Sequence, residues 1–573
     1  MSSTLNRRSF LTHSAATVGG IALAGSVVDE ILVPAAGATT GIGVGAPKIG
    51  GTLRVGLLSE QSSNQTFSGA QGKLDSAGFT LANTVFDPLF VTPTSGKGWL
   101  PYLALSATPN ANYTEWTIVL RRGVEFHNGT PFNAAAVVAN YKSAAANATV
   151  GLGIAPLIKD VTQPNPADNY SVLYTLQLPY TTFPVNLSEQ QIAYMAAPSA
   201  LAGPSNPIGT GPFKYKSWIL NETSTWVKNA KYWRKDAAGR KLPYLNEIEF
   251  KVIVDDTARF EALQSGSIDM MLTEAGPVIK QMLNTRGIVG ITGEAEARDP
   301  ASDCIMLNVA GKDYTGQSGA VNPSTLQYDH SRRSVLTDIR IRQACAYAIN
   351  RNQYLSVVDG GVGFTMNGIY RPASPFYKNP GYPSYNPAEA KKLVAAYKKA
   401  TGATKVSFVL DIVGSSSEQI TEFEFIQSQL AAVGIEITSR PVQQSVQING
   451  AILKTYEAVT WNQFGGTEPS LNFVWFDSGN FLNFAQNDDP VLTKAMLTAM
   501  AAKPYSASYI SNWAKVNTQL AKDIPYLFMA ATVYAWGAKT TVQNWAKSTA
   551  ADAKTAVLNP DAGAIRLTET WIS

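Results

Sequence analysis

The chain has 573 residues, a formal net charge of +4, 45% hydrophobic residues and 15% charged residues. A charge this small does not suit a protein that binds nucleic acid through a clustered basic face, so we expect no nucleic-acid partner. The apolar content supports large cores and excludes a disordered, collagenous or disulfide-framework chain. At roughly 100–200 residues per domain the length predicts about two to four domains. No apolar run reaches the ~18 residues that a membrane-spanning helix needs.

The first 38 residues have the layout of an export signal. Arg7 and Arg8 precede a mildly apolar stretch over 15–28, and Ala36-Gly37-Ala38 fits a small-x-small cleavage site. This pattern is typical of a twin-arginine signal peptide. We therefore expect a signal peptide over 1–38, a leader over 39–47 and export by the twin-arginine translocase. An amphipathic helix with a chance Arg-Arg is the alternative.

Two cysteines, Cys304 and Cys345, are present, and neither lies near the signal. A lipid-anchored exported protein needs a cysteine at its cleavage site, so we expect a soluble periplasmic protein, while the exterior of a Gram-positive cell stays open. In an oxidising compartment the two cysteines can form one disulfide. They can equally stay two buried thiols, because Cys345 falls on an apolar helix face.

Strands are predicted first in the mature chain. Residues 52–57, 114–120 and 245–254 alternate between apolar and polar residues, which is typical of half-buried strands. Thr130-Pro131 predicts the N-cap and first position of a helix. Residues 256–264 predict a short helix directly after the third strand.

Helices dominate the predictions in the second half. Asp338 predicts the N-cap of a helix whose apolar residues follow the spacing i, i+3, i+4, i+7, i+8. Asn386-Pro387 begins a second helix that Gly402 ends. A third helix is predicted over 418–433, followed by a strand over 435–437. Alternating strands and helices without a long repeat predict an α/β protein with βαβ units and some antiparallel hairpins.

Patterns of catalysis or metal binding are absent from the sequence. It contains no HExxH, G-x-S-x-G or P-loop motif. Beyond the signal only His127 and His330 join the two cysteines, and they are too scattered for a zinc site, which needs about four N/S ligands. We expect no metal, no cofactor and no catalytic residue, and His127 is predicted to be a turn or surface histidine. A hydrolase that draws two carboxylates from distant positions stays open.

Five segments in one order resemble the extracellular solute-binding family, family 5, that serves peptide, nickel and related ABC importers. They are WTIVLRRGVEFHNGTPF over 116–132, IGTGPFKY over 208–215, the motifs within 229–269, DIRIRQACAYAIN over 338–350, and the stretch over 426–435. The segments span essentially the whole mature chain.

The resemblance implies two lobes with a periplasmic-binding-protein type II-like fold and an extra α/β subdomain. A ligand would bind between the lobes, and hinge closure would bury it. The implied division is lobe I over 48–83, 208–300 and 520–573, the extra subdomain over 84–207, and lobe II over 301–519. A strand of lobe I is implied near 524–538.

The resemblance also implies which residues contact the ligand. The loop after the first strand would contribute Glu60, Ser62 and Asn64, and a segment of lobe II over 459–469 would contribute Trp461, Asn462 and Gln463. Independently of the resemblance, the guanidinium of Arg371, just before Pro372, is a candidate partner for a ligand carboxylate. Core packing is the alternative for Trp461, and a surface position is the alternative for Arg371.

One position departs from the peptide binders of the family. In them an aspartate of the lobe II segment holds the ammonium of the ligand, but here the matching residue is Gly465 and no Asp lies within 459–469. A buried ammonium without a counter-charge is costly. Binding of a free amine would therefore need Glu468 or Glu60. The implied cleft segments contain no histidine, which argues against nickel.

The resemblance implies the substrate-binding component of an ABC importer, a monomer that is not an enzyme. It would capture a small organic solute, such as a modified peptide, an opine-like conjugate or an oligosaccharide, and deliver it to an ABC permease in the cytoplasmic membrane. The alternatives are a secreted carboxylate-based hydrolase and an exported binding module for a chemoreceptor or peptide chaperone.

Overall fold

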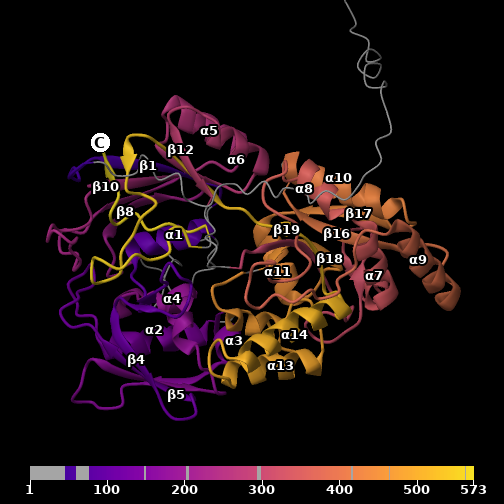
Figure 1. Ribbon diagram of the computed structural model, residues 1–573, viewed down its shortest axis with the longest axis horizontal. Helices are drawn as coiled ribbons and strands as arrows, with labels where there is room; N and C mark the ends of the chain where they lie inside the picture. Colours follow the sequence, from indigo (N-terminus) through magenta and orange to yellow (C-terminus); the bar gives the residue numbers. More distant parts are fainter. Residues whose placement is uncertain are drawn as a thin grey trace, which may run out of the picture. The chain divides into compact units, whose positions relative to one another are not determined.

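The computed structural model describes residues 45–59, 76–147, 150–201, 206–292, 299–414, 417–463, 465–561 and 563–573. The predicted export signal with Arg7 and Arg8, and the loop residues Glu60, Ser62 and Asn64, lie outside these ranges. Within them helices and strands alternate along the chain (Figure 1), which confirms the mixed α/β class.

The first large sheet has seven strands. Their order is β12 (Ile288–Thr292), β20 (Ala535–Lys539), β11 (Met270–Thr273), β1 (Thr52–Leu57), β10 (Glu247–Val252), β9 (Thr223–Lys228) and β8 (Phe213–Ile219). β1 is parallel to β10 and β11, and the outer strands are antiparallel to their neighbours. Leu53 and Val55 pack in one core with α1 (Ser76–Val85), while Met271 packs in another with α5 (Asp256–Ser265) and α6 (Gly276–Leu283).

The second large sheet has five strands. Their order is β17 (Glu436–Val442), β16 (Ser407–Val413), β18 (Ala458–Gln463), β13 (Ser302–Leu307) and β19 (Tyr526–Ala531). The first three are parallel, and β13 is antiparallel to both of its neighbours. The helices of this part are α7 (Ile339–Ala348), α8 (Arg351–Val357), α9 (Pro387–Thr401), α10 (Ser417–Ala431), α11 (Gln444–Leu453), α12 (Phe473–Phe476), α13 (Pro490–Ala501) and α14 (Ala507–Asp523).

A smaller antiparallel sheet lies within the predicted extra subdomain. Its order is β4 (Ala104–Pro109), β5 (Glu115–Leu120), β7 (Ser171–Leu176) and β6 (Ile158–Thr162), with α2 (Ala134–Ala146), α3 (Val150–Ile154) and α4 (Asn186–Glu189) beside it. Three two-stranded pairs complete the strands: β2 (Phe90–Val91) with β3 (Leu100–Pro101), β14 (Ala320–Val321) with β15 (Tyr328–Asp329), and β21 (Val542–Gln543) with β22 (Trp571–Ile572).

The chain passes between the two large sheets twice. One passage leads from β12 to β13, and the other leads from β19 to β20 across residues 532–534. The stretch near 524–538 is therefore two strands in two sheets and not one strand of lobe I. Residues up to Ala531 pair with β13, although the sequence division assigned everything from 520 onward to lobe I.

Local sequence signals place most elements correctly. Trp116, Ile118 and Leu120 of β5 are buried, as their alternation predicts. The Asp338 side chain accepts a hydrogen bond from the backbone N–H of Arg340 and so caps α7. α9 begins after Asn386 and ends at Gly402, whose φ of 72° is in the left-handed region that glycine tolerates best.

The helix predicted to start at Thr130-Pro131 begins later. Its N-cap is Asn133, whose side chain accepts from the N–H of Ala136. Pro131 instead forms an isolated β-bridge with Glu125 and closes a short turn. Asn is as good an N-cap as Thr, so tertiary pairing at the turn decides between the two sites.

His127 joins two of the family-like motifs and lies half-buried in a turn, as predicted. Its backbone N–H donates to Gly209 O at 2.8 Å, its Nδ1 accepts from Gly209 N–H at 3.3 Å, and its Nε2 lies 3.0 Å from Gly211 O. A Cβ at Gly209 or Gly211 would overlap the backbone of Val85. The glycines thus permit a close approach, and these motifs act as scaffold.

Asp87 connects the family-like motif within 229–269 to the contact between His127 and the glycines of 208–215. Its buried carboxylate accepts from Thr210 Oγ1 at 2.9 Å, from Tyr232 OH at 3.0 Å and from Trp233 Nε1 at 2.8 Å. Burial raises the pKa of Asp87, and the three hydrogen bonds oppose that shift. The network fixes the start of the extra subdomain to the seven-stranded body.

No helix of the described ranges is both long enough and apolar enough to cross a bilayer.

Candidate functional site

Parallel strand ends and both inter-sheet passages meet at one end of the five-stranded sheet. β18 ends at Gln463, which pairs with Ser302 at the start of β13, and Ser302 also pairs with Ala531 at the end of β19. The carboxyl ends of β16 and β17 lie at this end as well, because both run parallel to β18. Ligands of open α/β sheets bind outside the carboxyl ends of parallel strands. This end is therefore the candidate site.

Asp299 holds three segments together there. Its backbone exchanges two hydrogen bonds with Gly466, at 3.2 and 3.1 Å. Its Oδ1 accepts from the backbone N–H of Arg371 at 3.0 Å, and its Oδ2 accepts from Ser374 Oγ at 2.8 Å. The passage into β13, the segment after β18 and the loop that carries Arg371 are thus brought together, as the implied contact regions require.

The position of Gly465 leaves no room for a side chain. A Cβ placed there would overlap the carbonyl oxygens of Asp299 and Pro300. An aspartate at this position would need the passage into β13 to move. The departure from the peptide binders at Gly465 therefore has a steric basis in this chain.

Two hydrogen-bonding groups beside Asp299 are enclosed and have no partner among the described residues. They are the hydroxyl of Tyr370 and Nε of Arg371. Leaving such a group unsatisfied costs about 1–3 kcal/mol. The pKa of Tyr370 is raised, first by burial and then by the Asp299 and Glu468 carboxylates, which places both acids near this phenol. Glu468 is 2% exposed.

Trp461, Asn462 and Gln463 have different surroundings. The Trp461 ring meets Phe484 edge-on, with centroids 6.0 Å apart, and is half-buried against the core. Gln463 is buried, and its Nε2 donates to Asn472 Oδ1 at 3.4 Å. Asn462 is exposed, and its Oδ1 accepts from Thr532 Oγ1 in the second passage at 3.2 Å. Of the three, Asn462 has the most exposed side chain.

Asp303 lies across from Asn462 in the strand pairing. Its carboxylate accepts a hydrogen bond from the Tyr354 hydroxyl of α8. Burial raises the pKa of Asp303 to about 6, although the bonds from Tyr354 and from the Cys304 backbone oppose the shift.

Sequence patterns did not identify Asp299, Tyr370 or Asp303. The Asp299-Pro300 dipeptide at the expected lobe boundary was the available signal for the first, since such pairs favour turns. No local pattern marks the other two, because their roles depend on segments far away in the chain.

Cys304 and Cys345 are free and buried, so the disulfide that the sequence left open is not formed. The Cys304 thiol donates to the carbonyl oxygen of Trp461 at 3.2 Å. Burial raises the pKa of both thiols, that of Cys345 to about 12.

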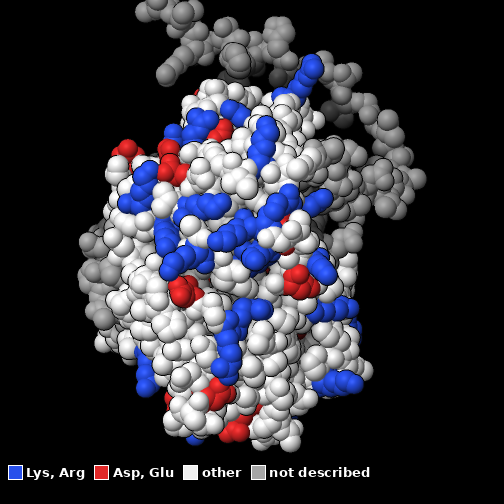
Figure 2. Space-filling view, turned by 90° about the vertical axis from the view of Figure 1, so that its left-hand side faces the viewer, with Lys and Arg blue, Asp and Glu red and all other residues white. Residues whose placement is uncertain are grey.

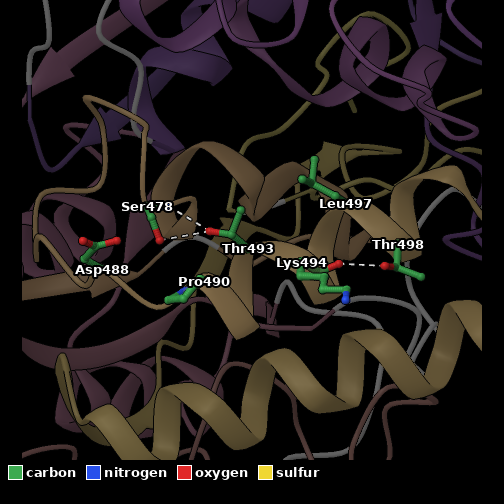
Figure 3. Close-up of a pocket in the computed structure, with 7 residues that line it drawn as sticks. All are labelled: Ser478, Asp488, Pro490, Thr493, Lys494, Leu497 and Thr498. Atoms are coloured by element: carbon green, nitrogen blue, oxygen red, sulfur yellow. Dashed lines mark hydrogen bonds between the residues drawn. The ribbon is translucent and has the colours of Figure 1, made fainter.

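A hollow of about 430 Å³ lies elsewhere, on α13 and the segment before it (Figure 3). Ser478 and Thr493 hydrogen-bond to each other at its wall, with oxygens 3.0 Å apart. None of the predicted ligand contacts lines it; the lining residues are Ser478, Asp488, Pro490, Thr493, Lys494, Leu497 and Thr498.

Comparison with known proteins identifies the family. The model of the bacterial extracellular solute-binding proteins, family 5 (middle), matches residues 99–485. The glutathione-binding protein GsiB of Salmonella choleraesuis (strain SC-B67) is 27% identical over 359 residues, which are 61% of this chain and 62% of that protein. GsiB of Pectobacterium atrosepticum is 26% identical over 389 residues, 66% of this chain and 68% of the relative. The chain thus spans about three fifths of the first relative's length.

Solved structures share the fold. The PBP AgaA from A. tumefacien R10, in complex with agropinic acid, has a TM-score of 0.75 at 19% identity and covers 91% of this chain and 99% of its own. The oligopeptide-binding protein AppA from Bacillus subtilis, in complex with a nonapeptide, has a TM-score of 0.72 at 20% identity and covers 92% and 100%. These likenesses confirm the periplasmic-binding-protein type of fold. With the family model matched over 387 residues (99 to 485), the chain belongs to the bacterial extracellular solute-binding proteins of family 5.

Proposed function

We propose that this protein is the substrate-binding component of an ABC importer and that it captures a small organic solute by hinge closure. The solute would be held where the two inter-sheet passages meet the end of β18. Bending of the chain where it passes between the two sheets, as over 532–534, would change how the two sheets face each other, which is the motion that hinge closure needs. No covalent step is required, so the protein would not be an enzyme.

The chemistry of the site favours a ligand that carries a carboxylate. The observation behind this is the pair of enclosed, unpartnered groups, Tyr370 OH and Arg371 Nε, beside Asp299. Both can donate hydrogen bonds, and guanidinium suits carboxylate. A peptide-like or opine-like solute is therefore favoured over a neutral oligosaccharide. Glu468, buried nearby, would receive an ammonium in place of the missing aspartate.

Native mass spectrometry of the protein purified from its own organism tests this proposal. We expect a co-purified small molecule with a carboxylate. Calorimetric titration with glutathione, dipeptides, opines and neutral oligosaccharides would then rank the classes. Tight binding of a neutral sugar alone would contradict the carboxylate assignment, and chemically altered ligand after incubation would favour the hydrolase instead.

Arg371→Gln provides the site-specific test. We expect it to weaken a carboxylate ligand at least about tenfold, because a hydrogen bond to a charged group contributes about 1.5–3 kcal/mol. Arg286→Gln removes the same charge from an exposed position and should leave affinity unchanged. Trp461, Asn462 and Gln463 remain proposed contacts, with Asn462→Ala the most direct variant of the three. Glu60, Ser62 and Asn64 also remain proposed contacts.

We infer that the protein is exported to the periplasm by the twin-arginine route, works there as a soluble monomer and delivers its ligand to an ABC permease. Replacing Arg7 and Arg8 by lysine should leave the precursor in the cytoplasm, as cell fractionation would detect. Light scattering checks the monomer. Deleting the permease should abolish uptake without affecting binding, whereas a chemoreceptor module would leave uptake intact.

The proposed division keeps lobe I, the extra subdomain and lobe II, with one change at the last boundary. The passage over 532–534 then marks the last lobe boundary better than position 520, because β19 pairs with β13. Limited proteolysis with and without ligand would test it. Cleavage at the passages should slow when ligand is bound.

A further inference from the structure

Five lysines gather at one edge of the seven-stranded sheet, and we call them the lysine face. They come from β8, from β9 and from the loop that leads to β10: Lys214, Lys228, Lys231, Lys235 and Lys241. Figure 2 looks onto the side of the molecule where β8 and β10 lie in Figure 1, and it shows Lys and Arg gathered across this side with few Asp and Glu.

Backbone pairing and side-chain contacts show how these lysines lie. Lys235 and Lys241 oppose each other in an isolated antiparallel bridge. The Lys214 ammonium donates to the carbonyl oxygen of His127 at 3.2 Å. Lys231 reaches the same turn, with its Nζ 3.5 Å from an oxygen of Glu125. Lys214 and Lys231 thus approach the same turn over 125–127, while Lys235 and Lys241 lie opposite each other in the loop that leads to β10.

The positive charge of the cluster is poorly neutralised within the protein. Lys231 has its exposed pair with Glu125, but no carboxylate of the described ranges lies within 4.0 Å of the other four ammonium groups. The nearby Asp236 is bound by Arg240 and by the Tyr244 hydroxyl. The pKa of Lys228 is lowered, first by burial and then by the ammonium of Lys241, so like charges act on each other here.

We propose that the lysine face rests on an anionic lipid surface and holds this protein against the membrane. Lysine ammonium groups are separate point charges on flexible stems, which suit a diffuse layer of phosphates better than one enclosed anion. Lys231, Lys235 and Lys241 are exposed in the loop that leads from β9 to β10. Several lysines near an anionic bilayer are attracted together, so this face gives a reversible attachment that weakens when the lysines are removed. The inference does not depend on which solute is bound.

Vesicle sedimentation tests the lipid contact with the full mature chain. Vesicles of phosphatidylcholine alone and of phosphatidylcholine with phosphatidylglycerol are compared. We expect binding to the second kind only, falling as salt is raised, because salt screens exposed charges. The variant Lys231→Gln/Lys235→Gln/Lys241→Gln should bind at least about tenfold more weakly.

The helix α9 offers a control with the same loss of charge. Lys391, Lys392 and Lys399 are exposed on it, and changing all three to Gln removes three positive charges from another part of the chain. Equal weakening by both triple variants would show a net-charge effect and overturn the proposal. Absence of binding to anionic vesicles would also overturn the proposal. If the Lys231→Gln/Lys235→Gln/Lys241→Gln variant nevertheless lowered uptake, the lysine face would be assigned to an acidic protein partner instead. Unfolding curves would verify that both variants are folded.

Discussion

The hydroxyl of Tyr180 donates a hydrogen bond to Ser470 Oγ at 2.9 Å, joining the extra subdomain to the segment that follows β18. Thr182 Oγ1 lies 3.0 Å from the same serine oxygen, and the backbone N–H of Thr181 donates to Met500 O at 2.9 Å. The Tyr180, Thr182 and Ser470 side chains are buried. The segment that carries Glu468 is therefore held from two directions, by Asp299 on one side and by the extra subdomain on the other.

Ser470→Ala should lower the free energy of unfolding by about 1–3 kcal/mol, because it removes the partner of two buried hydroxyls. Urea denaturation measures the change. Ser511→Ala is the control, since Ser511 is exposed on α14 and such changes stay within about 0.5 kcal/mol. Equal effects of the two variants would mean that the buried contact does not stabilise the fold.

Gly465→Ala should destabilise the protein by about 1–3 kcal/mol, because the added carbon overlaps the backbone of Asp299 and Pro300 and the passage into β13 must shift. Thermal unfolding measures it. Gly450→Ala is a matched control: this glycine lies in α11 with open space around its Cβ position, so alanine should be neutral or stabilising by up to about 1 kcal/mol. An unchanged melting temperature for the first variant would refute the steric account of position 465.

Lowering the pH should decrease the free energy of unfolding through the protonation of His127. Burial, with a smaller contribution from Lys214, lowers its pKa to about 4. The unfolded state, with an ordinary value near ~6.5, then binds more protons, so stability is present above that value and is lost as pH falls toward the folded pKa. The full effect is up to about 3 kcal/mol. His127→Gln should flatten this acid-side slope in urea denaturation; an unchanged slope would assign it to other groups.

Glu457 should act in the opposite direction. It is 1% exposed, and burial raises its pKa to about 7, although bonds from Ser334 and from the backbone N–H of Val409 oppose the shift. At pH values between the ordinary pKa of a glutamate and this raised value, Glu457 keeps its proton in the folded state and loses it in the unfolded state. The stability from this group is therefore complete below the ordinary pKa and is lost as pH rises through about 7. Glu457→Gln should remove this decline, and a steeper decline in the variant would contradict the assignment.

Trp461→Ala should lower stability by about 2 kcal/mol, because the half-buried ring packs edge-on against Phe484. Trp461→Phe keeps an aromatic contact and should recover part of the loss. Calorimetry gives both melting temperatures. An unchanged melting temperature combined with lost ligand binding would instead make Trp461 a ligand contact and not a core residue.

Much of the fold follows from local patterns, and particular elements show where such patterns end. Alternation places β5, and the caps at Asp338 and Asn386 place α7 and α9, because these signals act within a few residues. The apolar run over 526–538 looks like one strand, yet pairing partners far away in the chain divide it between two sheets. Asp299 escaped detection for the same reason, since Gly466, Arg371 and Ser374 are all distant in sequence.

The enclosed thiols of Cys304 and Cys345 make the molecule convenient to label. Because both have raised pKa values and no exposed surface, the reactive thiolate form is scarce and reagents do not reach it. Cysteines introduced at exposed positions on either side of residues 532–534 would take up fluorophores selectively while the natural pair is left in place. Energy transfer between such dyes would then follow the relative movement of the seven-stranded and five-stranded sheets as a solute is added.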